Sequence, residues 1–250
     1  MQLYAHRGAN LKLPENTMEA FRQGLLDGAT ALEMDVRLTG DGSVVVFHDE
    51  DGWRMAREKN LVAQTSWDEM RNWDLKKGIR SMPIKTQFLN QAFRVPLLAE
   101  VLDAFPQTFL NIDIKPSNLR AVSLVIELIR KHKATERVRL ASASLRVHQM
   151  LHDLRYEGLV GLSRLEVMAV YFAPESLLQN MRLRGRAAQV PLARGLFRFD
   201  QPWFIEKCHR LGLTVDYLTI NNRDDAKRLA KVGADGIMSD DPATILMVLP

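Results

Sequence analysis

Cysteine is almost missing from this chain: Cys208 is the single one among 250 residues. One cysteine excludes an internal disulfide framework and a cysteine-rich zinc site. No apolar run approaches the roughly 18 residues that a membrane-spanning helix needs. Residues 1–7 have neither the apolar stretch nor the cleavage site of a signal peptide. The sequence therefore predicts a cytoplasmic protein without an integral membrane segment.

Two kinds of binding motif are missing as well. No G-x-G-x-x-G or P-loop opens an expected helix, which disfavours a doubly wound nucleotide-binding sheet. No nucleic-acid-reading motif is present, so we expect no nucleic acid partner. The net charge is only +4, but residues 116–211 hold 16 Lys and Arg against 8 Asp and Glu. This basic segment is either a solvated helical surface or one that attracts an anionic substrate or, peripherally, a membrane.

What the chain does have is a regular alternation of short apolar runs, typical of strands, with amphipathic helical stretches. Eight such β-then-α units indicate an α/β fold, a single TIM (β/α)₈ barrel over residues 1–250. The first helix should begin with Asn16 as its N-cap, because Glu19 follows three residues later. The expected strands are Gln2–Ala5, Ala31–Arg37, Phe109–Lys115, Val138–Ala141, Leu159–Leu162, Ala188–Pro191, Thr214–Ile220 and Gly236–Ser239.

A hairpin interrupts the alternation after the second expected strand. The pair Asp41-Gly42 between two β-rich runs predicts a two-residue turn that folds residues 44–47 back antiparallel. In that register residues 40 and 43 pair, and His48 lies opposite Asp35.

Residues 49–96 then form an insertion after the second strand. A structureless connection of this length is improbable inside a compact domain, so we interpret it as a small subdomain or lid over the barrel's βα-loop face. We expect at least two of its three tryptophans, Trp53, Trp67 and Trp73, to form a small core of its own.

Charged residues alternate with apolar ones along two expected strands. Period-two geometry puts Glu33, Asp35 and Arg37 on one face of the second strand, and Asp113 and Lys115 on one face of 109–115. The apolar face must meet the helices, so these charges point into the barrel, where unpaired charge is costly. Either Glu33 and Asp35 form buried ion pairs with Arg37 and Lys115, or Glu33, Asp35 and Asp113 hold a divalent cation. Three hard oxygen ligands would favour Mg²⁺ or Ca²⁺ over zinc.

Two histidines are expected at the same rim. His6 ends the first strand, which neighbours the second in a barrel, and His48 lies beside Asp35. Two imidazoles that flank a metal-bound anion can act as general base and general acid in phosphoryl transfer. The remaining histidines and Cys208 fall in helical patterns, where we expect structural or surface roles: His132, His148, His152 and His209.

Several sequence blocks, in order along essentially the whole chain, resemble the glycerophosphodiester phosphodiesterase family. Each block alone is a weak signal, but the set is highly specific. The blocks are His6-Arg7-Gly8, Pro14-Glu15-Asn16-Thr17, Glu33-Met34-Asp35-Val36, Thr39-Gly40-Asp41-Gly42, Val46-Phe47-His48-Asp49, residues 95–102 and residues 233–242.

The resemblance implies a TIM barrel with an insertion after the second strand. It also implies hydrolysis of glycerophosphodiesters, a small-molecule substrate class, to glycerol 3-phosphate and an alcohol. The site roles it implies are His6 and His48 as the acid/base pair, Glu33, Asp35 and Asp113 as cation ligands, Arg7 and Lys115 as phosphate contacts, and Glu15 as a residue that shapes the site.

Three positions depart from the family pattern. Asp113 stands where Glu is usual, Leu218 where Trp is usual, and Ala143 where Phe is usual. The first shortens a proposed ligand by one methylene, and Leu218 removes an aromatic wall from the expected pocket. These changes leave the proposed catalytic set complete and the leaving alcohol open.

Two other functions remain compatible with the sequence. A lysophospholipase D would use the same barrel, cation and histidines on a lysophospholipid. A non-catalytic binding barrel would be expected to lack an acidic ligand or a histidine, and none is missing here.

Overall fold

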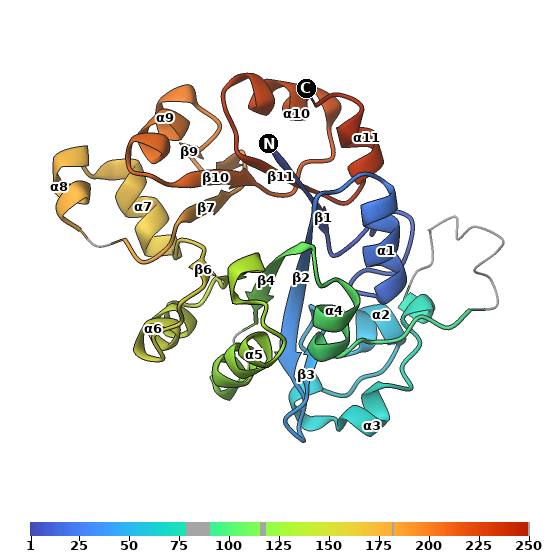
Figure 1. Cartoon of the computed structure of the whole chain (residues 1–250). Coiled ribbons are helices and arrows are strands. Elements are labelled where there is room, and N and C mark those ends of the chain that lie inside the picture. The colour runs from blue at the N-terminus through green and yellow to red at the C-terminus, as the bar shows by residue number, and fades with distance from the viewer. Residues whose placement is uncertain (79–90, 116–118, 182, 250) are drawn as a thin grey trace.

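The computed structural model describes residues 1–78, 91–115, 119–181 and 183–249. Its main sheet is a nearly closed parallel barrel in the order β6-β5-β4-β2-β1-β11-β10-β7 (Figure 1). The predicted fold class and its eight strands are thus confirmed, although four predicted strands end one to three residues early in the structure. The barrel strands are β1 (Gln2–His6), β2 (Ala31–Leu38), β4 (Phe109–Ile114), β5 (Val138–Ala141), β6 (Leu159–Val160), β7 (Ala187–Val190), β10 (Thr214–Tyr217) and β11 (Gly236–Ser239).

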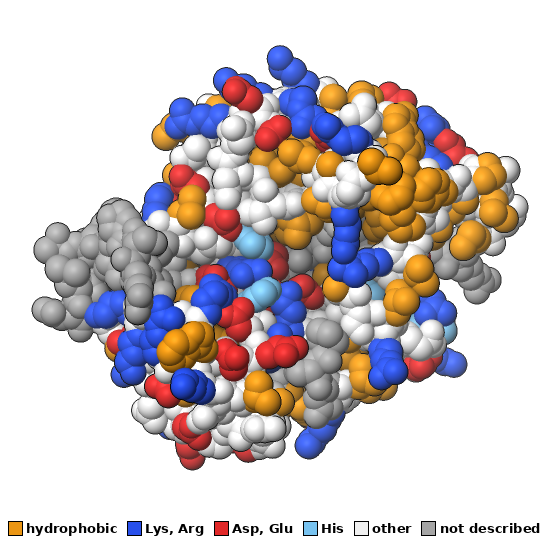
Figure 2. Space-filling model, turned by 180° about the vertical axis from the view of Figure 1, so that it is seen from behind, with side chains coloured by type: hydrophobic (Ala, Val, Ile, Leu, Met, Phe, Trp, Pro, Cys, Tyr) orange, Lys and Arg blue, Asp and Glu red, His pale blue; other side chains and the backbone are white. Residues whose placement is uncertain are grey.

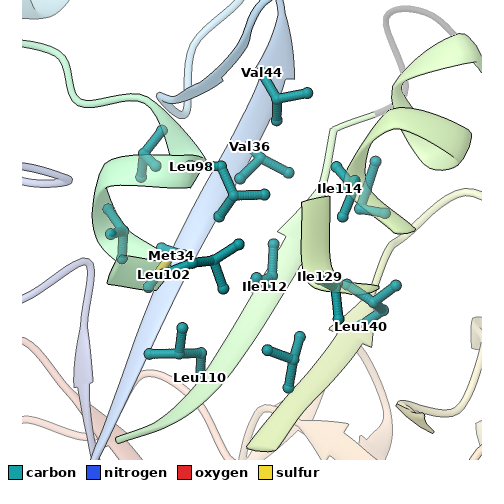
Figure 3. Packing of buried hydrophobic residues seen from close by; sticks show 14 of the residues in the cluster. Met34, Val36, Val44, Leu98, Leu102, Leu110, Ile112, Ile114, Ile129 and Leu140 are labelled. Atoms are coloured by element: carbon teal, nitrogen blue, oxygen red, sulfur yellow. The ribbon is translucent and has the colours of Figure 1, made fainter. Parts of the chain in front are cut away.

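Helices surround the barrel because one face of each strand is apolar. On the side of β2, β4 and β5, alternate residues such as Met34 and Ile112 join one buried cluster with the apolar faces of the adjacent helices (Figure 3). A second cluster covers β7, β10 and β11. The covering helices are α1 (Met18–Leu26), α4 (Leu98–Ala104), α5 (Arg120–Lys131), α6 (Leu145–Asp153), α7 (Arg164–Phe172), α8 (Glu175–Asn180), α9 (Pro202–Arg210), α10 (Arg223–Lys231) and α11 (Pro242–Leu246), with a 3₁₀ turn η4 (Thr135–Arg137) before β5.

The barrel closes at a seam between β6 and β7. A single parallel bridge joins Gly161 to Ala187 there. Backbone hydrogen bonds from Leu162 N to the Ala187 oxygen and from Arg186 N to the Val160 oxygen, 2.8 Å each, hold the two edges together.

The hairpin after β2 has a different register from the predicted one. Strand β3 (Val44–Val46) pairs antiparallel with β2, Val36 opposite Val46, and Phe47 N donates to the Asp35 oxygen. Asp35 therefore faces Phe47, and the prediction that His48 lies opposite Asp35 is wrong by one residue. The loop has three residues because Thr39 pairs with Ser43: Thr39 N donates to the Ser43 oxygen at 2.9 Å, and Ser43 N donates to Thr39 Oγ1 at 2.8 Å. Gly42 in this loop takes a positive φ of 91°.

The insertion begins as short helical turns around an apolar cluster that it shares with the barrel residues Leu13, Ala20, Val45 and Phe47. It contains α2 (Trp53–Ala56), η1 (Val62–Gln64), α3 (Trp67–Met70) and η2 (Leu75–Gly78). Trp73 is buried in the cluster and Trp67 packs against it, whereas Trp53 is half-exposed. Two of the three tryptophans thus join a core, as expected, but it is one that the insertion shares with the barrel. The lid role stays a prediction, and part of the segment, 79–90, lies outside the described residues.

Helix α1 begins one residue later than predicted. Thr17, not Asn16, is the N-cap, and its Oγ1 accepts from the Ala20 N–H at 3.2 Å. Asn16 takes a positive φ of 56° and turns its amide toward the barrel interior. Within the described residues, every helix is too short or too polar to reach across a bilayer.

Candidate active site

Three carboxylates meet at the rim of neighbouring strands. Glu33 and Asp35 alternate with apolar residues on β2, and the β2–β4 register puts Asp35 directly beside Asp113. Glu33 lies beside His6 in the β1–β2 register. Glu33 and Asp35 are buried, so their charges require partners.

Two cations supply those partners. Lys115 Nζ lies 2.8 Å from Asp35 Oδ1 and 2.6 Å from Asp113 Oδ2. Arg7 Nε lies 2.9 Å from Asp35 Oδ2. Arg37 does not join the carboxylates; its Nε donates to the His48 oxygen at 2.8 Å. The ion-pair network therefore forms with Arg7 in the place that was predicted for Arg37.

Burial and nearby charges shift the pKa values of Glu33, Asp35 and Asp113 in different directions. Burial, and after it the neighbouring Asp35, raise the pKa of Glu33 to about 7. Burial also raises the pKa of Asp35, but Lys115 and then Arg7 lower it more, so it ends below its ordinary value. Burial raises the pKa of Asp113, against the opposing effect of Lys115. Glu33 and Asp113 are thus the two acids whose charge the site does not fully compensate.

Each predicted catalytic histidine is held by a carboxylate through Nδ1. His6 Nδ1 lies 2.6 Å from Asp240 Oδ1, and its Nε2 lies 3.8 Å from Glu33 Oε2. His48 Nδ1 lies 2.7 Å from Asp49 Oδ1. Burial lowers the pKa of His6, but Glu33 and the hydrogen bond to Asp240 outweigh it and leave the pKa above its ordinary value. Despite the shifted hairpin register, His48 lies close enough to Asp35 and Asp113 to contribute to lowering the pKa of each carboxyl group.

Glu15 connects the barrel rim to the insertion. Its Oε1 accepts from Arg7 NH1 at 3.1 Å and from Arg54 NH2 at 2.6 Å. Arg54, on α2, also contacts Asp49 Oδ2 through Nε at 2.6 Å. The Arg54 guanidinium therefore contacts both Glu15, the partner of Arg7, and Asp49, the partner of His48.

The structure adds four residues to the predicted eight. Asp240 and Asp49 orient the histidines, Arg54 braces the rim, and Asn16 Nδ2 donates to Asp35 Oδ2 at 3.0 Å. Asp240 follows β11, the other neighbour of β1, so barrel topology alone could have suggested it. Asp49 adjoins His48 in the sequence, whereas Arg54 carries no signal before the insertion is folded.

The chemistry of the donor set, though not its spacing in this structure, suits a hard divalent cation. Asp113 Oδ1 is buried without a hydrogen-bond partner, and Glu33 is an undercompensated carboxylate. Over the part of the chain that the structure describes, no three acidic, histidine or cysteine side chains converge closely enough to hold a metal ion. The Lys115 ammonium stands between Asp35 and Asp113 instead.

A cavity of about 740 Å³ extends from Glu33 and Asp113 toward β6, β7 and α7. Its far end is apolar, with Phe197 and Phe199 among the lining residues, and Leu218 and Ala143 line it as well. Figure 2 shows the pale blue of histidine in a hollow among acidic and basic side chains.

Among the described residues, the other histidines and Cys208 make no hydrogen bond or ion pair with the site carboxylates Glu33, Asp35 and Asp113. His148 is buried, with Nε2 2.8 Å from the Ser142 oxygen. Cys208 is buried too, and burial raises the pKa of its thiol to about 12. Their geometry agrees with the expected structural roles.

Taken with the fold, this rim defines the class: a TIM barrel whose strand ends carry paired histidines, clustered carboxylates and two cations. Residues 6–244 match the model of the glycerophosphoryl diester phosphodiesterase family. The chain belongs to that family.

Individual relatives agree. The chain is 30% identical, over 97% of its length and 95% of the relative's, to a glycerophosphodiester phosphodiesterase of Caldanaerobacter subterraneus. It is 27% identical to a lysophospholipase D of Rattus norvegicus, covering 96% of this chain and 83% of that protein. A glycerophosphodiester phosphodiesterase structure from Agrobacterium tumefaciens has the same fold, with a TM-score of 0.81 at 22% identity, covering 99% of this chain and 98% of that one.

Proposed function

We propose that this chain hydrolyses glycerophosphodiesters to glycerol 3-phosphate and an alcohol, with His6 and His48 as the acid/base pair. The observation that carries the proposal is the pair of Nδ1 contacts to Asp240 and Asp49. A carboxylate at Nδ1 fixes the tautomer and orientation of an imidazole and leaves Nε2 to exchange the proton. The named phosphodiesterase at 30% identity supports the substrate class.

The two positively charged side chains of the rim, Arg7 and Lys115, would bind the phosphate. Arg7 and Lys115 carry fixed positive charge, and Glu15 and Asp35 hold the Arg7 guanidinium in place from two directions. A guanidinium so oriented can bind phosphate oxygens without reorganising first.

Glu33, Asp35 and Asp113 would hold the cation, Mg²⁺ or Ca²⁺. When bound there it would neutralise charge on the phosphate oxygens. Lys115, which contacts Asp35 and Asp113 in this structure, would add a positive charge for the phosphate oxygens. The residues that exchange protons remain His6 and His48.

The direct test measures glycerol 3-phosphate released from glycerophosphocholine. His6→Ala and His48→Ala should each lower kcat by roughly 10²–10⁴-fold, and EDTA should abolish turnover until Mg²⁺ or Ca²⁺ is restored. His152→Ala is the matched control, because His152 is exposed on α6 beside Asp153. Full activity in either site variant would contradict the acid/base assignment. No release from any headgroup with any divalent ion would favour a binding barrel.

A second substrate class is favoured by the cavity. Lysophospholipids share the phosphodiester but add an acyl chain, and the apolar end of the 740 Å³ cavity can hold one. Ala143→Phe would narrow this cavity and should reduce activity on lysophosphatidylcholine more than on glycerophosphocholine. Equal effects on both would assign the cavity no role in substrate choice.

We also propose a cytoplasmic location for the protein, which fractionation of cells that express the tagged full chain would test.

A further inference from the structure

Large apolar side chains are exposed around α7, the hairpin of β8 (Ala193–Arg194) and β9 (Phe197–Arg198), and the start of α9. Leu165 and Phe172 on α7 are each 63% exposed, Leu196 at the hairpin tip is 96% exposed, and Trp203 is 43% exposed. We call these four residues the hairpin patch. Figure 2 shows hydrophobic side chains gathered on the side of the molecule where these elements lie.

Aromatic contacts join two members of the hairpin patch, Phe172 and Trp203, through the Tyr171 ring. The Tyr171 ring lies 5.0 Å from the Phe172 and Trp203 rings, centroid to centroid, and 5.6 Å from Phe197. Phe172 in turn lies 5.4 Å from Phe197. Single exposed apolar residues are ordinary, but a connected group of this kind marks an interaction surface.

Arginines border the patch. Arg164 on α7 and Arg194 on β8 are exposed, and among the described residues neither has a carboxylate within ion-pair distance. Arg198 contacts Asp200 but stays more than half exposed. Residues 191–199 contain no acidic side chain. Trp, Phe and Leu flanked by unpaired arginines are typical of segments that lie at the headgroup level of an anionic membrane.

The same elements form the apolar end of the cavity. Arg164, Arg194, Gly195 and Phe197 line it together with Glu33 and Asp113 at its other end. A flat lipid surface against the hairpin patch would therefore lie next to the cavity mouth.

We propose that the hairpin patch docks this protein on the surface of a bilayer that contains anionic phospholipid. Leu196, Phe172 and Trp203 enter the boundary between headgroups and acyl chains, and Arg164 and Arg194 contact lipid phosphates. This binding is independent of the proposed hydrolysis, since it needs no turnover.

Vesicle sedimentation tests the proposal with the full chain. The wild type should bind phosphatidylcholine vesicles that contain about one-third phosphatidylglycerol more tightly than pure phosphatidylcholine vesicles, by roughly fivefold for each guanidinium engaged. Leu196→Asp should weaken binding about tenfold or more. Leu26→Asp is the matched control, because Leu26 is 81% exposed at the end of α1 and outside the patch.

Because Leu196 is almost fully exposed and does not line the cavity, Leu196→Asp should leave folding and glycerophosphocholine hydrolysis unchanged. The proposal fails if the wild type binds neither kind of vesicle, or if Leu26→Asp weakens binding as much as Leu196→Asp. It also fails if light scattering shows a dimer that Leu196→Asp dissociates while vesicle binding is absent, since the partner is then a second copy.

Discussion

Replacing Glu33 by glutamine should make the protein more stable while it removes activity. Glu33 is buried beside Asp35, and its pKa lies at about 7. Glutamine keeps an oxygen for the Arg7 backbone N–H, which now donates to Glu33 Oε2 at 3.1 Å, but it carries no charge.

The magnitude follows from the pKa. Between the ordinary value of 4.5 and about 7, the folded state holds a proton on Glu33 that the unfolded state has lost. Stability of the wild type from this group therefore falls as pH rises through that window. At pH 8 and without divalent cation, Glu33→Gln should gain about 2–3 kcal/mol, or roughly 4–12 °C in Tm for a chain of this size.

Thermal unfolding in EDTA from pH 5 to pH 8 measures this difference directly. The gain should be small at pH 5, where Glu33 is already protonated, and should grow toward pH 8. Added Mg²⁺ should stabilise the wild type and not the variant, because the variant lacks a proposed ligand. A variant that is less stable than the wild type by the same amount at both pH values would refute the reasoning.

Two further substitutions test other parts of the barrel. Asp240→Asn removes a carboxylate that helps to raise the pKa of His6, so the limb of the kcat–pH profile that follows His6 should move to lower pH; an unchanged profile would contradict this role. Asp216→Ala leaves the buried guanidinium of Arg139 without its partner and should cost about 3–5 kcal/mol in urea-induced unfolding, whereas a loss below about 1 kcal/mol would show that Arg139 finds other solvation.

Strand alternation was the most informative part of the sequence. It placed Glu33 and Asp35 inside the barrel and Met34 and Val36 against the helices, because a strand has only two faces and one of them must be apolar. The site follows from this, since strand ends that neighbour in the barrel bring their polar residues to one rim.

Local turn chemistry was harder to predict. Asp41-Gly42 indicated a two-residue turn, but residues 40–42 form a three-residue loop between Thr39 and Ser43. The Asp41 carboxylate accepts from Trp67 N, a contact with the insertion. Asn16 is of a residue type that often serves as an N-cap, yet its side-chain amide donates to Asp35 Oδ2 instead. In both cases a tertiary contact outweighed a local preference, and short sequence patterns do not contain such contacts.

The seam between β6 and β7 is the place where the barrel should open most easily. Elsewhere the strands share ladders, but here one bridge and two backbone bonds close the ring. Gly185 allows the close approach, since a Cβ there would lie 2.5 Å from Leu162 N. Amide protons at the seam should therefore exchange with solvent before those of β1 and β2. Leu162 and Val190 at the seam also line the cavity. Local opening of the seam would therefore admit a bulkier ligand without moving the carboxylates across the barrel.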